Sequence, residues 1–238
     1  PVAPASPAAP DMTAATDLGA SSTDNITSNA TPAFTVTAPP AGGSIVLLVD
    51  GVAVPATYNA GTGTVTPNSA LANGAHSISY QLVDAAGNTS TASSTLSVTI
   101  DTAAPAQPSL ATPEGPRVNA NEAADGTPLV TTLPAGAQAG DVLTTVVTPP
   151  SGPAITVSYT LQAADIAAGT VTQTITSAQL TAGGNGSWTA SATLTDVAGN
   201  ASPAATGSFT LDTTAPAATG ALTATAPNDS GTLGDNIT

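Results

Sequence analysis

The sequence contains no cysteine and no lysine, and Arg117 is its only arginine. Without cysteine there are no disulfides and no thiolate metal sites. A nucleic-acid-binding surface and an anionic lipid surface are excluded as well, because both are bound through Lys and Arg. Fifteen acidic residues leave a formal net charge of −14. The partners that suit this chain electrostatically are cations.

Aromatic residues are also scarce, at 3% of the composition, and no apolar run approaches the roughly 20 residues that cross a bilayer. The sequence therefore predicts no membrane insertion and a stretch from inside a longer secreted chain. Hydrophobic residues still make up 41% of the 238 residues, so cores must rest on Val, Leu, Ile and Ala. The length suits two domains of about 100 residues each.

An internal repeat supports two domains. Residues 82–88 (LVDAAGN) recur as residues 194–200 (LTDVAGN), and residues 99–105 (TIDTAAP) recur as residues 210–216 (TLDTTAP). The segment DNIT occurs at residues 24–27 and again at residues 235–238. Fixed-period similarity of this kind is typical of units that stack end to end. The repeat predicts domains at residues 1–105 and 106–216, joined through a Pro-rich linker, and the start of a third repeat at residues 217–238.

Each repeat carries the period-two hydrophobic pattern of half-buried antiparallel strands. In the first repeat Ile78, Tyr80 and Leu82 alternate with polar residues, and residues 188–194 continue the pattern in the second. We expect further strands at 33–37, 44–49, 64–66, 142–148, 155–161 and 171–175, and a short helix only at 162–168, ended by Gly169. The prediction is an all-β fold of two tandem immunoglobulin-like Greek-key β-sandwiches.

The acidic residues concentrate where the domains should meet. We expect the turn between the last two strands to lie at the same end of a sandwich as its first strand, and the last strand to finish at the other end. On that basis three groups of carboxylates form: Asp84 with Asp11, Asp17 and Asp24; Asp101 with Glu114, Glu122, Asp125 and Asp196; and Asp212 with Asp229 and Asp235. Only Asp50, Asp141 and Asp165 remain outside these groups.

Two interpretations of these groups stay open. Carboxylates about 4 Å apart repel by roughly 4 kcal/mol at an effective dielectric of 20, so several together without Lys or Arg favour a bound cation. Calcium suits oxygen-rich segments because it takes 6 to 8 oxygen ligands, whereas zinc would need Cys or His. The alternative is that Asp-x-x-Gly-Asn is a plain hairpin turn in which the Asp binds backbone amides.

With these motifs the chain resembles the bacterial Ig-like repeats of giant biofilm-associated and RTX-type surface adhesins. The resemblance implies type I secretion, display on a Gram-negative cell surface, and interdomain calcium that stiffens a long extender built of neighbouring repeats of one chain. The implied calcium ligands are Asp17, Asp24, Asp84, Asp101, Asp196, Asp212, Asp229 and Asp235. The second repeat departs from the family pattern over residues 118–126, where Glu122 is our preferred substitute ligand and Asp125 is a further one.

Neither a catalytic nor a ligand-binding site stands out. His76, the only histidine, aligns with Trp188 at the start of a strand, so we expect a packing role and no enzyme. The run 183–188 (GGNGSW) begins like a calcium-binding β-roll repeat but has Trp188 where Asp is required. The alternative function is a carbohydrate- or receptor-binding module, for which Tyr58 and Tyr159 are the free aromatic residues. We expect a monomer.

Overall fold

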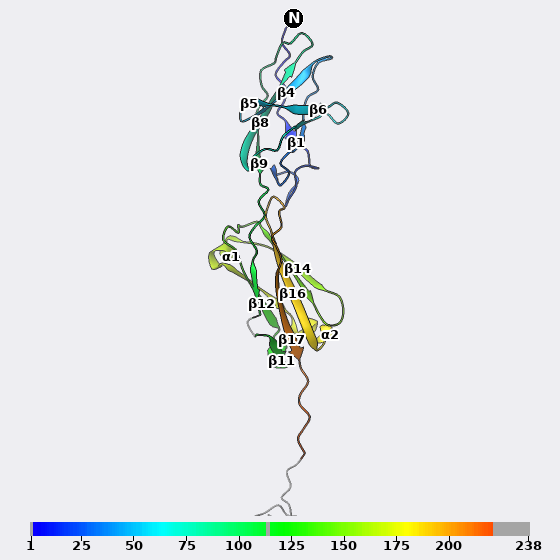
Figure 1. The fold of residues 1–238 in the computed structure, drawn as a ribbon, viewed down its shortest axis with the longest axis vertical. Coiled ribbons are helices and arrows are strands. Elements are labelled where there is room, and N and C mark those ends of the chain that lie inside the picture. Colours follow the sequence, from blue (N-terminus) through cyan, green and yellow to red (C-terminus); the bar gives the residue numbers. More distant parts are fainter. Residues whose placement is uncertain (1, 113–114, 221–238) are drawn as a thin grey trace, which may run out of the picture.

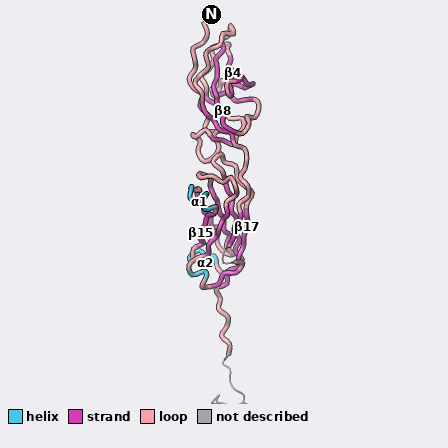
Figure 2. Tube along the Cα trace, turned by 90° about the vertical axis from the view of Figure 1, so that its left-hand side faces the viewer, coloured by secondary structure: helices cyan, strands magenta, loops and turns pink. Residues whose placement is uncertain are grey.

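The structure is a computed structural model that describes residues 2–112 and 115–220. Two β-sandwiches lie end to end along one long axis, with the described N-terminus at one tip (Figure 1). The view turned by 90° shows the same narrow, in-line arrangement (Figure 2). The predicted all-β fold of Ig-like sandwiches is confirmed.

The first sandwich holds nine strands in two sheets. The strands are β1 (Asp11–Met12), β2 (Ile26–Thr27), β3 (Phe34–Thr35), β4 (Ser44–Val49), β5 (Val52–Val54), β6 (Ala56–Asn59), β7 (Thr64–Pro67), β8 (Gly74–Val83) and β9 (Leu96–Ile100). One sheet has the order β1-β3-β7-β6 and the other β2-β9-β8-β4-β5. Among the described strands of this sandwich, only β2 and β9 pair in parallel. The first edge segment therefore splits between the two sheets, as β1 and then β2.

The second sandwich repeats this topology with one strand fewer. Its strands are β10 (Ser109–Ala111), β11 (Arg117–Asn119), β12 (Thr127–Thr132), β13 (Val142–Thr148), β14 (Ile155–Thr160), β15 (Thr170–Ile175), β16 (Gly186–Thr195) and β17 (Ala205–Asp212). The sheets have the orders β10-β12-β15 and β11-β17-β16-β13-β14. Between β14 and β15, where the first sandwich has β6, the chain forms the short helix α1 (Ala163–Ala168).

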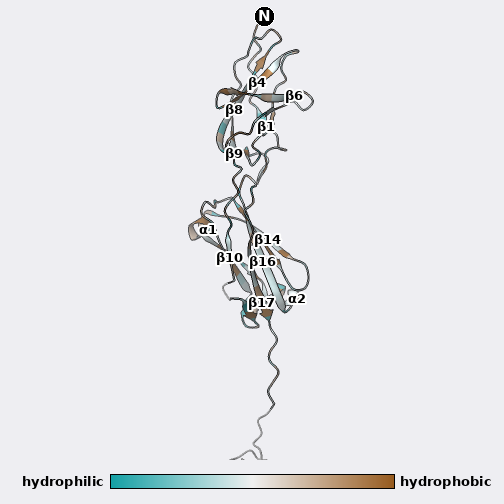
Figure 3. Ribbon diagram, in the orientation of Figure 1, coloured by the Kyte–Doolittle hydropathy of each residue, from teal (hydrophilic) through white to brown (hydrophobic). Residues whose placement is uncertain are grey.

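The period-two pattern buries hydrophobic residues of the strands in the core of each sandwich, as predicted. Hydrophobic residues, coloured brown in Figure 3, occur along strands of both sandwiches. In the first core Phe34, Leu47, Ile78 and Tyr80 are fully buried. The Tyr80 hydroxyl accepts a hydrogen bond of 2.7 Å from the backbone N–H of Thr37. This bond ties β8 to the segment that follows β3 and satisfies the polar end of a buried ring.

The second core is built around one aromatic pair. Trp188 on β16 and Phe209 on β17 stack with ring centroids 5.7 Å apart. Trp188 is fully buried, and its indole N–H donates to the carbonyl of Gly184. A stacked pair of this kind contributes about 0.5 to 1.5 kcal/mol beyond the area that it buries.

The helix predicted at residues 162–168 is confirmed as α1, and Gly169 ends it with φ of 70° in the left-handed region. A second helix, α2 (Ser177–Gly183), and a 3-10 turn, η1 (Glu122–Ala124), were not predicted. A signal for α2 was present, because Thr176 and Gln179 form a capping box at its start. None of the described helices is long and apolar enough to cross a membrane.

Candidate functional site

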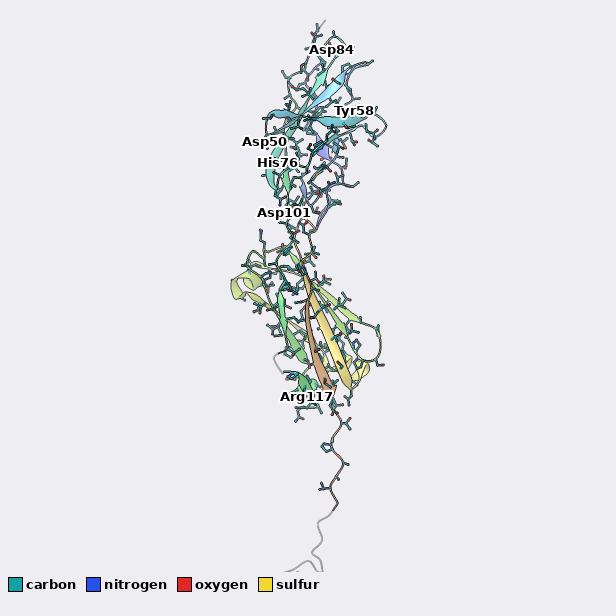
Figure 4. The ribbon with its side chains drawn as sticks, in the orientation of Figure 1. Asp50, Tyr58, His76, Asp84, Asp101 and Arg117 are labelled. Carbon is teal, nitrogen blue, oxygen red and sulfur yellow. The ribbon has the colours of Figure 1, made fainter. Side chains whose placement is uncertain are left out.

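The predicted acidic residues fall at the two ends of each sandwich. We call the end that holds the turn between the last two strands the leading end, and the end where the last strand finishes the trailing end. The trailing end of the first sandwich meets the leading end of the second, and we call this contact the joint. In Figure 4 Asp84 lies at the free leading end of the first sandwich, Asp101 at the joint and Arg117 at the trailing end of the second.

The turn Asp-x-x-Gly-Asn has the same internal bonding in both sandwiches. Oδ1 of Asp84 accepts from the backbone N–H of Asn88 at 2.8 Å, and Oδ2 accepts from its side-chain amide at 2.7 Å. Asp196 and Asn200 repeat these bonds at 2.8 and 2.9 Å. Both carboxylates therefore make the internal hydrogen bonds of a hairpin turn. The side-chain amide of Asn88 is the main cause that lowers the pKa of Asp84 below its ordinary value.

The Asp at the end of each last strand also has a local role. Oδ1 of Asp101 accepts from the backbone N–H of Ala103, and Oδ1 of Asp212 accepts from that of Thr214, both at 3.0 Å. In each case the bond closes a turn that redirects the chain out of the sheet. Each carboxylate keeps its second oxygen outside this turn.

The expected grouping of Asp17 and Asp24 with Asp84 is wrong. Their segment runs down to the trailing end, because β2 pairs in parallel with the end of β9 and the N–H of Asp101 donates to the carbonyl of Thr27. The first edge segment runs the whole length of the sandwich between β1 and β2, whereas the prediction places all of it at the leading end.

Asp17 is a buried acid of this segment whose carboxylate is only partly hydrogen-bonded. It is 3% exposed, its Oδ2 accepts a 3.2 Å bond from the N–H of Asn25, and its Oδ1 has no hydrogen-bond partner. Burial raises the pKa of Asp17, and the charges of Asp24 and Asp11 raise it further. A buried carboxylate oxygen without a donor is costly unless a cation or proton compensates it.

Asp141, which sequence reasoning left outside the groups, lies at the joint. It directly precedes β13, is 3% exposed, and accepts a 2.8 Å bond from the N–H of Gln138. Burial raises the pKa of Asp141, and the charges of Asp196 and Asp101 add to the increase. The strand registers explain why the repeat did not reveal it. Val142 pairs with Thr195 as Ser44 pairs with Val83, so the first sandwich has Gly43 at this position.

Asp101, Asp141 and Asp196 line one pocket of about 240 Å³ between the two sandwiches. Its other lining residues are Ala103, Ala104, Pro105, Ala106, Ala135, Gly136, Gln138 and Val197, and none of them is basic. Among the described residues, no three acidic or histidine side chains converge closely enough to hold an ion by themselves. An ion here would also need carbonyl, amide or water oxygens.

Glu122 and Asp125 are not at the joint, contrary to expectation. Glu122 lies at the trailing end of the second sandwich, where it lines a pocket with Asp212 and Arg117. Asp125 follows η1 at the start of β12, on the same end. The reason is the one that applies to Asp17, since β11 pairs in parallel with the end of β17. Glu114, Asp229 and Asp235 lie outside the described residues.

The oxygen atoms at the joint have the chemistry that a hard cation prefers as ligands. Carboxylates come from both sandwiches, and the buried Oδ1 of Asp17 accepts no hydrogen bond. The pocket has no Lys or Arg in its lining. Calcium accepts such mixed oxygen ligands in flexible geometry. At the trailing end of the second sandwich, in contrast, Arg117 already supplies a positive charge beside Glu122 and Asp212.

His76 packs against the first sandwich as predicted. Its side chain is 13% exposed, Nδ1 lies 2.8 Å from Oδ2 of Asp50, and Nε2 lies 2.8 Å from the carbonyl oxygen of Ala72. Asp50 and Gly51 form the two-residue turn between β4 and β5, both with positive φ. The Asp-Gly pair between two hydrophobic runs was a hairpin signal that sequence reasoning missed.

The two free aromatic residues do not form a binding platform. Tyr58 packs against the first core, while Tyr159 lies on β14 of the second sandwich and donates its hydroxyl to Asp165 at 3.0 Å. A pocket of about 450 Å³ at the trailing end of the second sandwich is lined by Ala, Ser, Thr, Leu, Gly and Asn residues alone. It offers neither an aromatic face nor a charge to a sugar or a receptor.

Solved structures include chains of low similarity to this one. Among solved structures, similar chains include one from a study of host cell surface retention by a 1.5-MDa bacterial ice-binding adhesin, with 21% identity and a TM-score of 0.37, covering 90% of this chain and 67% of the other. Another is from the Clostridium thermocellum CbhA fibronectin(III)-like modules, with 13% identity and a TM-score of 0.45, covering 79% of this chain and 87% of the other.

The comparison with curated proteins gave no match. A family model does match the first sandwich: residues 4–102 fit the model described as Bacterial Ig-like domain. The first sandwich of this chain is therefore similar in sequence to bacterial Ig-like domains.

Proposed function

We propose that the chain is an extender region of a bacterial cell-surface adhesin, in which calcium at the joint holds successive Ig-like domains in line. The observation that carries the proposal is that both sandwiches contribute carboxylates, Asp101 from one and Asp141 and Asp196 from the other, to one pocket without a basic residue. No catalytic step is proposed, since Ig-like domains are typically non-catalytic.

Because of these charges, the stability of the joint would depend on whether the chain is inside or outside the cell. Without a cation, burial is the main cause that raises the pKa of Asp141, and the charges of Asp196 and Asp101 raise it further, so this carboxylate is costly to ionise. Extracellular modules bind calcium at about 10⁻⁴ to 10⁻³ M, so such a joint would be empty in the cytosol and filled outside the cell. A ligand that binds only the folded state stabilises it by about 2.7 kcal/mol at a hundredfold excess over Kd.

The in-line arrangement would let each domain add its full length to the array. Strands of about ten residues rise about 33 Å, so each added sandwich carries a tip domain a few nanometres farther from the cell. Stiff joints keep that length, whereas flexible joints would let the array coil. On this proposal the chain supports adhesion and biofilm formation from outside the cell, as a monomer whose partners are neighbouring repeats and calcium.

The test is small-angle scattering with thermal melts, in calcium and in EGTA, on the wild-type chain and on Asp101→Asn. We expect calcium to narrow the distribution of shapes and to raise the melting temperature of the wild type, and to do less in the variant. Asp212→Asn is the matched control, because Asp212 closes the same turn but lies away from the joint. Shape and melting that ignore calcium would overturn the proposal.

A further inference from the structure

The joint is made by main-chain contacts as well as by charge. The N–H of Ala20 donates to the carbonyl of Val197 at 3.0 Å, and the N–H of Ser28 donates to the carbonyl of Ala198 at 3.2 Å. Both donors belong to the trailing loop of the first sandwich, which we define as residues 17–28. Both acceptors belong to the hairpin turn of the second sandwich, residues 196–200. The loop therefore contacts the turn through main-chain hydrogen bonds on both sides.

Two glycines make this close approach possible. A Cβ placed on Gly19 would collide with the carbonyl oxygen of Val197, and a Cβ placed on Gly199 would lie 3.0 Å from the Cα of Gly19. The side-chain amide of Asn200 adds a 2.8 Å bond to the carbonyl of Asp101. Ala198, at the tip of the turn, is 0% exposed. The trailing loop thus recognises a turn that carries Gly at its fourth position and Asn at its fifth.

The hairpin turn of the first sandwich, residues 84–88, has the same features, but no other described segment covers its tip. Its internal bonds match those of residues 196–200, and Gly87 has φ of 86° where Gly199 has 93°. A Cβ on Gly87 would meet no atom within 4 Å, and Ala86 is exposed. The first sandwich therefore presents at its free leading end the surface that the second sandwich buries at the joint.

The segments that lead into the two sandwiches also match each other in burial and hydrogen bonding. Residues 4–7 (PASP) and 105–108 (PAQP) show the same order of partly buried, exposed, exposed and buried positions. Ser6 donates to the carbonyl of Ala92, and Gln107 donates to that of Ala204, the equivalent position in the repeat. Two separate segments of the first sandwich thus have the geometry that, in the second, belongs to the joint.

We propose that the leading end of the first sandwich, formed by residues 84–88 with residues 4–7, is a docking surface for the trailing loop of another domain of the first kind, with glycine at the position of Gly19. This extends the proposed extender role but does not depend on calcium. The carboxylate of Asp141 has no counterpart here, since Gly43 takes its place, so the main-chain contacts carry the docking.

The test adds a second copy of the first domain in front of the full chain, by joining Ala104 of a copy of residues 1–104 to Pro4. Only the first copy is isotopically labelled, by segmental ligation, so that amide exchange reports Ala20 and Ser28 of the new joint alone. We expect both amides to be protected in calcium and in EGTA, and the particle to lengthen by about 33 Å, the rise of a ten-residue strand.

Three variants locate the contact. Gly19→Ala in the first copy should speed exchange of its Ala20 and Ser28 amides at least tenfold, and Gly87→Ala in the second copy should act in the same direction. In the original two-domain chain Gly87→Ala should leave those amides unchanged, whereas Gly199→Ala, which carries the same positive φ, should expose them.

Amides of the first copy that exchange in the wild type as fast as in Gly19→Ala would overturn this proposal. So would a Gly87→Ala change with no effect on them. A joint that depends on these glycines but ignores calcium supports the docking surface and overturns only the calcium role, so the two failures are distinguishable.

Discussion

His76 lies between two hydrogen-bond acceptors, with Nδ1 2.8 Å from Oδ2 of Asp50 and Nε2 2.8 Å from the carbonyl oxygen of Ala72. A neutral imidazole carries one proton and can donate to only one of them. The arrangement therefore fits the doubly protonated ring. The Ala72 carbonyl, followed by the Asp50 carboxylate, raises the pKa of His76 above 6.5, against a smaller opposite effect of burial.

The first prediction follows from the sign of that shift. The folded state holds the His76 proton more tightly than the unfolded state, so this stabilisation is complete below pH 6.5 and is lost as the pH rises through the raised pKa. Asp50 is 52% exposed, so we expect a loss of only about 0.5 to 1 kcal/mol. Calorimetric melts between pH 6 and 9 should show the first domain lose a few degrees.

His76→Gln provides the control for this prediction. The chain has no cysteine or lysine and no second histidine. The groups with ordinary pKa values between pH 6 and 9 are therefore the His76 side chain and the terminal amine. The melting temperature of the variant should be flat over the same range. An equal slope in wild type and variant would contradict the assignment.

The second prediction concerns Tyr80, whose hydroxyl accepts from the N–H of Thr37. Tyr80→Phe keeps the buried ring but leaves that amide without its partner, which costs about 1 kcal/mol. The aligned residue of the second sandwich is Ala192, which makes no such bond, and Trp188 is the only tryptophan. Tryptophan fluorescence should therefore report an unchanged second domain while calorimetry shows the first one melt earlier.

Much of the fold could be predicted because strand patterns are local. The alternation of Ile78, Tyr80 and Leu82 needs only their own side chains, and the resulting β8 and its neighbours were placed correctly. The ends of the sandwich are a different matter. Whether Asp17 lies near Asp84 or near Asp101 depends on how far the first edge segment runs before β2 pairs with β9, and that pairing is non-local.

Asp141 shows a second limit of the sequence. Its burial beside Asp196 results from the docking of two domains and from the register of β13 on β16, and no motif of the repeat marks it. Comparison of the two repeats even hides it, because Gly43 takes its place in the first. The close backbone approach of Gly19 to Val197 could not be predicted either, because glycine is common in polar loops for many other conformational reasons.

The third prediction separates the turn from the joint. Asn88→Ala and Asn200→Ala each remove the side-chain bond to the Asp of the same turn, and each should cost its own domain about 1 kcal/mol. Only Asn200 also bonds the carbonyl of Asp101 across the joint. Small-angle scattering should therefore show a wider range of interdomain bending for Asn200→Ala than for Asn88→Ala. Equal bending in the two variants would mean that this bond does not hold the domains in line.

The fourth prediction is that Asp141→Asn stabilises the joint in EGTA and removes its response to calcium. The folded-state pKa of Asp141 lies above 3.8, so its contribution favours the protonated form, and stability falls as the pH rises through that pKa. Asn imitates the uncharged acid and still accepts from the N–H of Gln138. In EGTA at neutral pH we expect the variant to gain about 1 kcal/mol, or a few degrees, for the second domain.

In calcium the order of the two proteins should reverse. The wild type would gain the binding energy of an ion held in part by Asp141, while the variant has lost a charged ligand that calcium prefers. Asp165→Asn is unsuitable as a control because Asp165 caps α1, so Asp125→Asn, an exposed acid at the opposite end of the second sandwich, is the matched change. If Asp141→Asn destabilises the chain in EGTA and in calcium alike, its carboxylate is a structural hydrogen-bond acceptor and the ion belongs elsewhere.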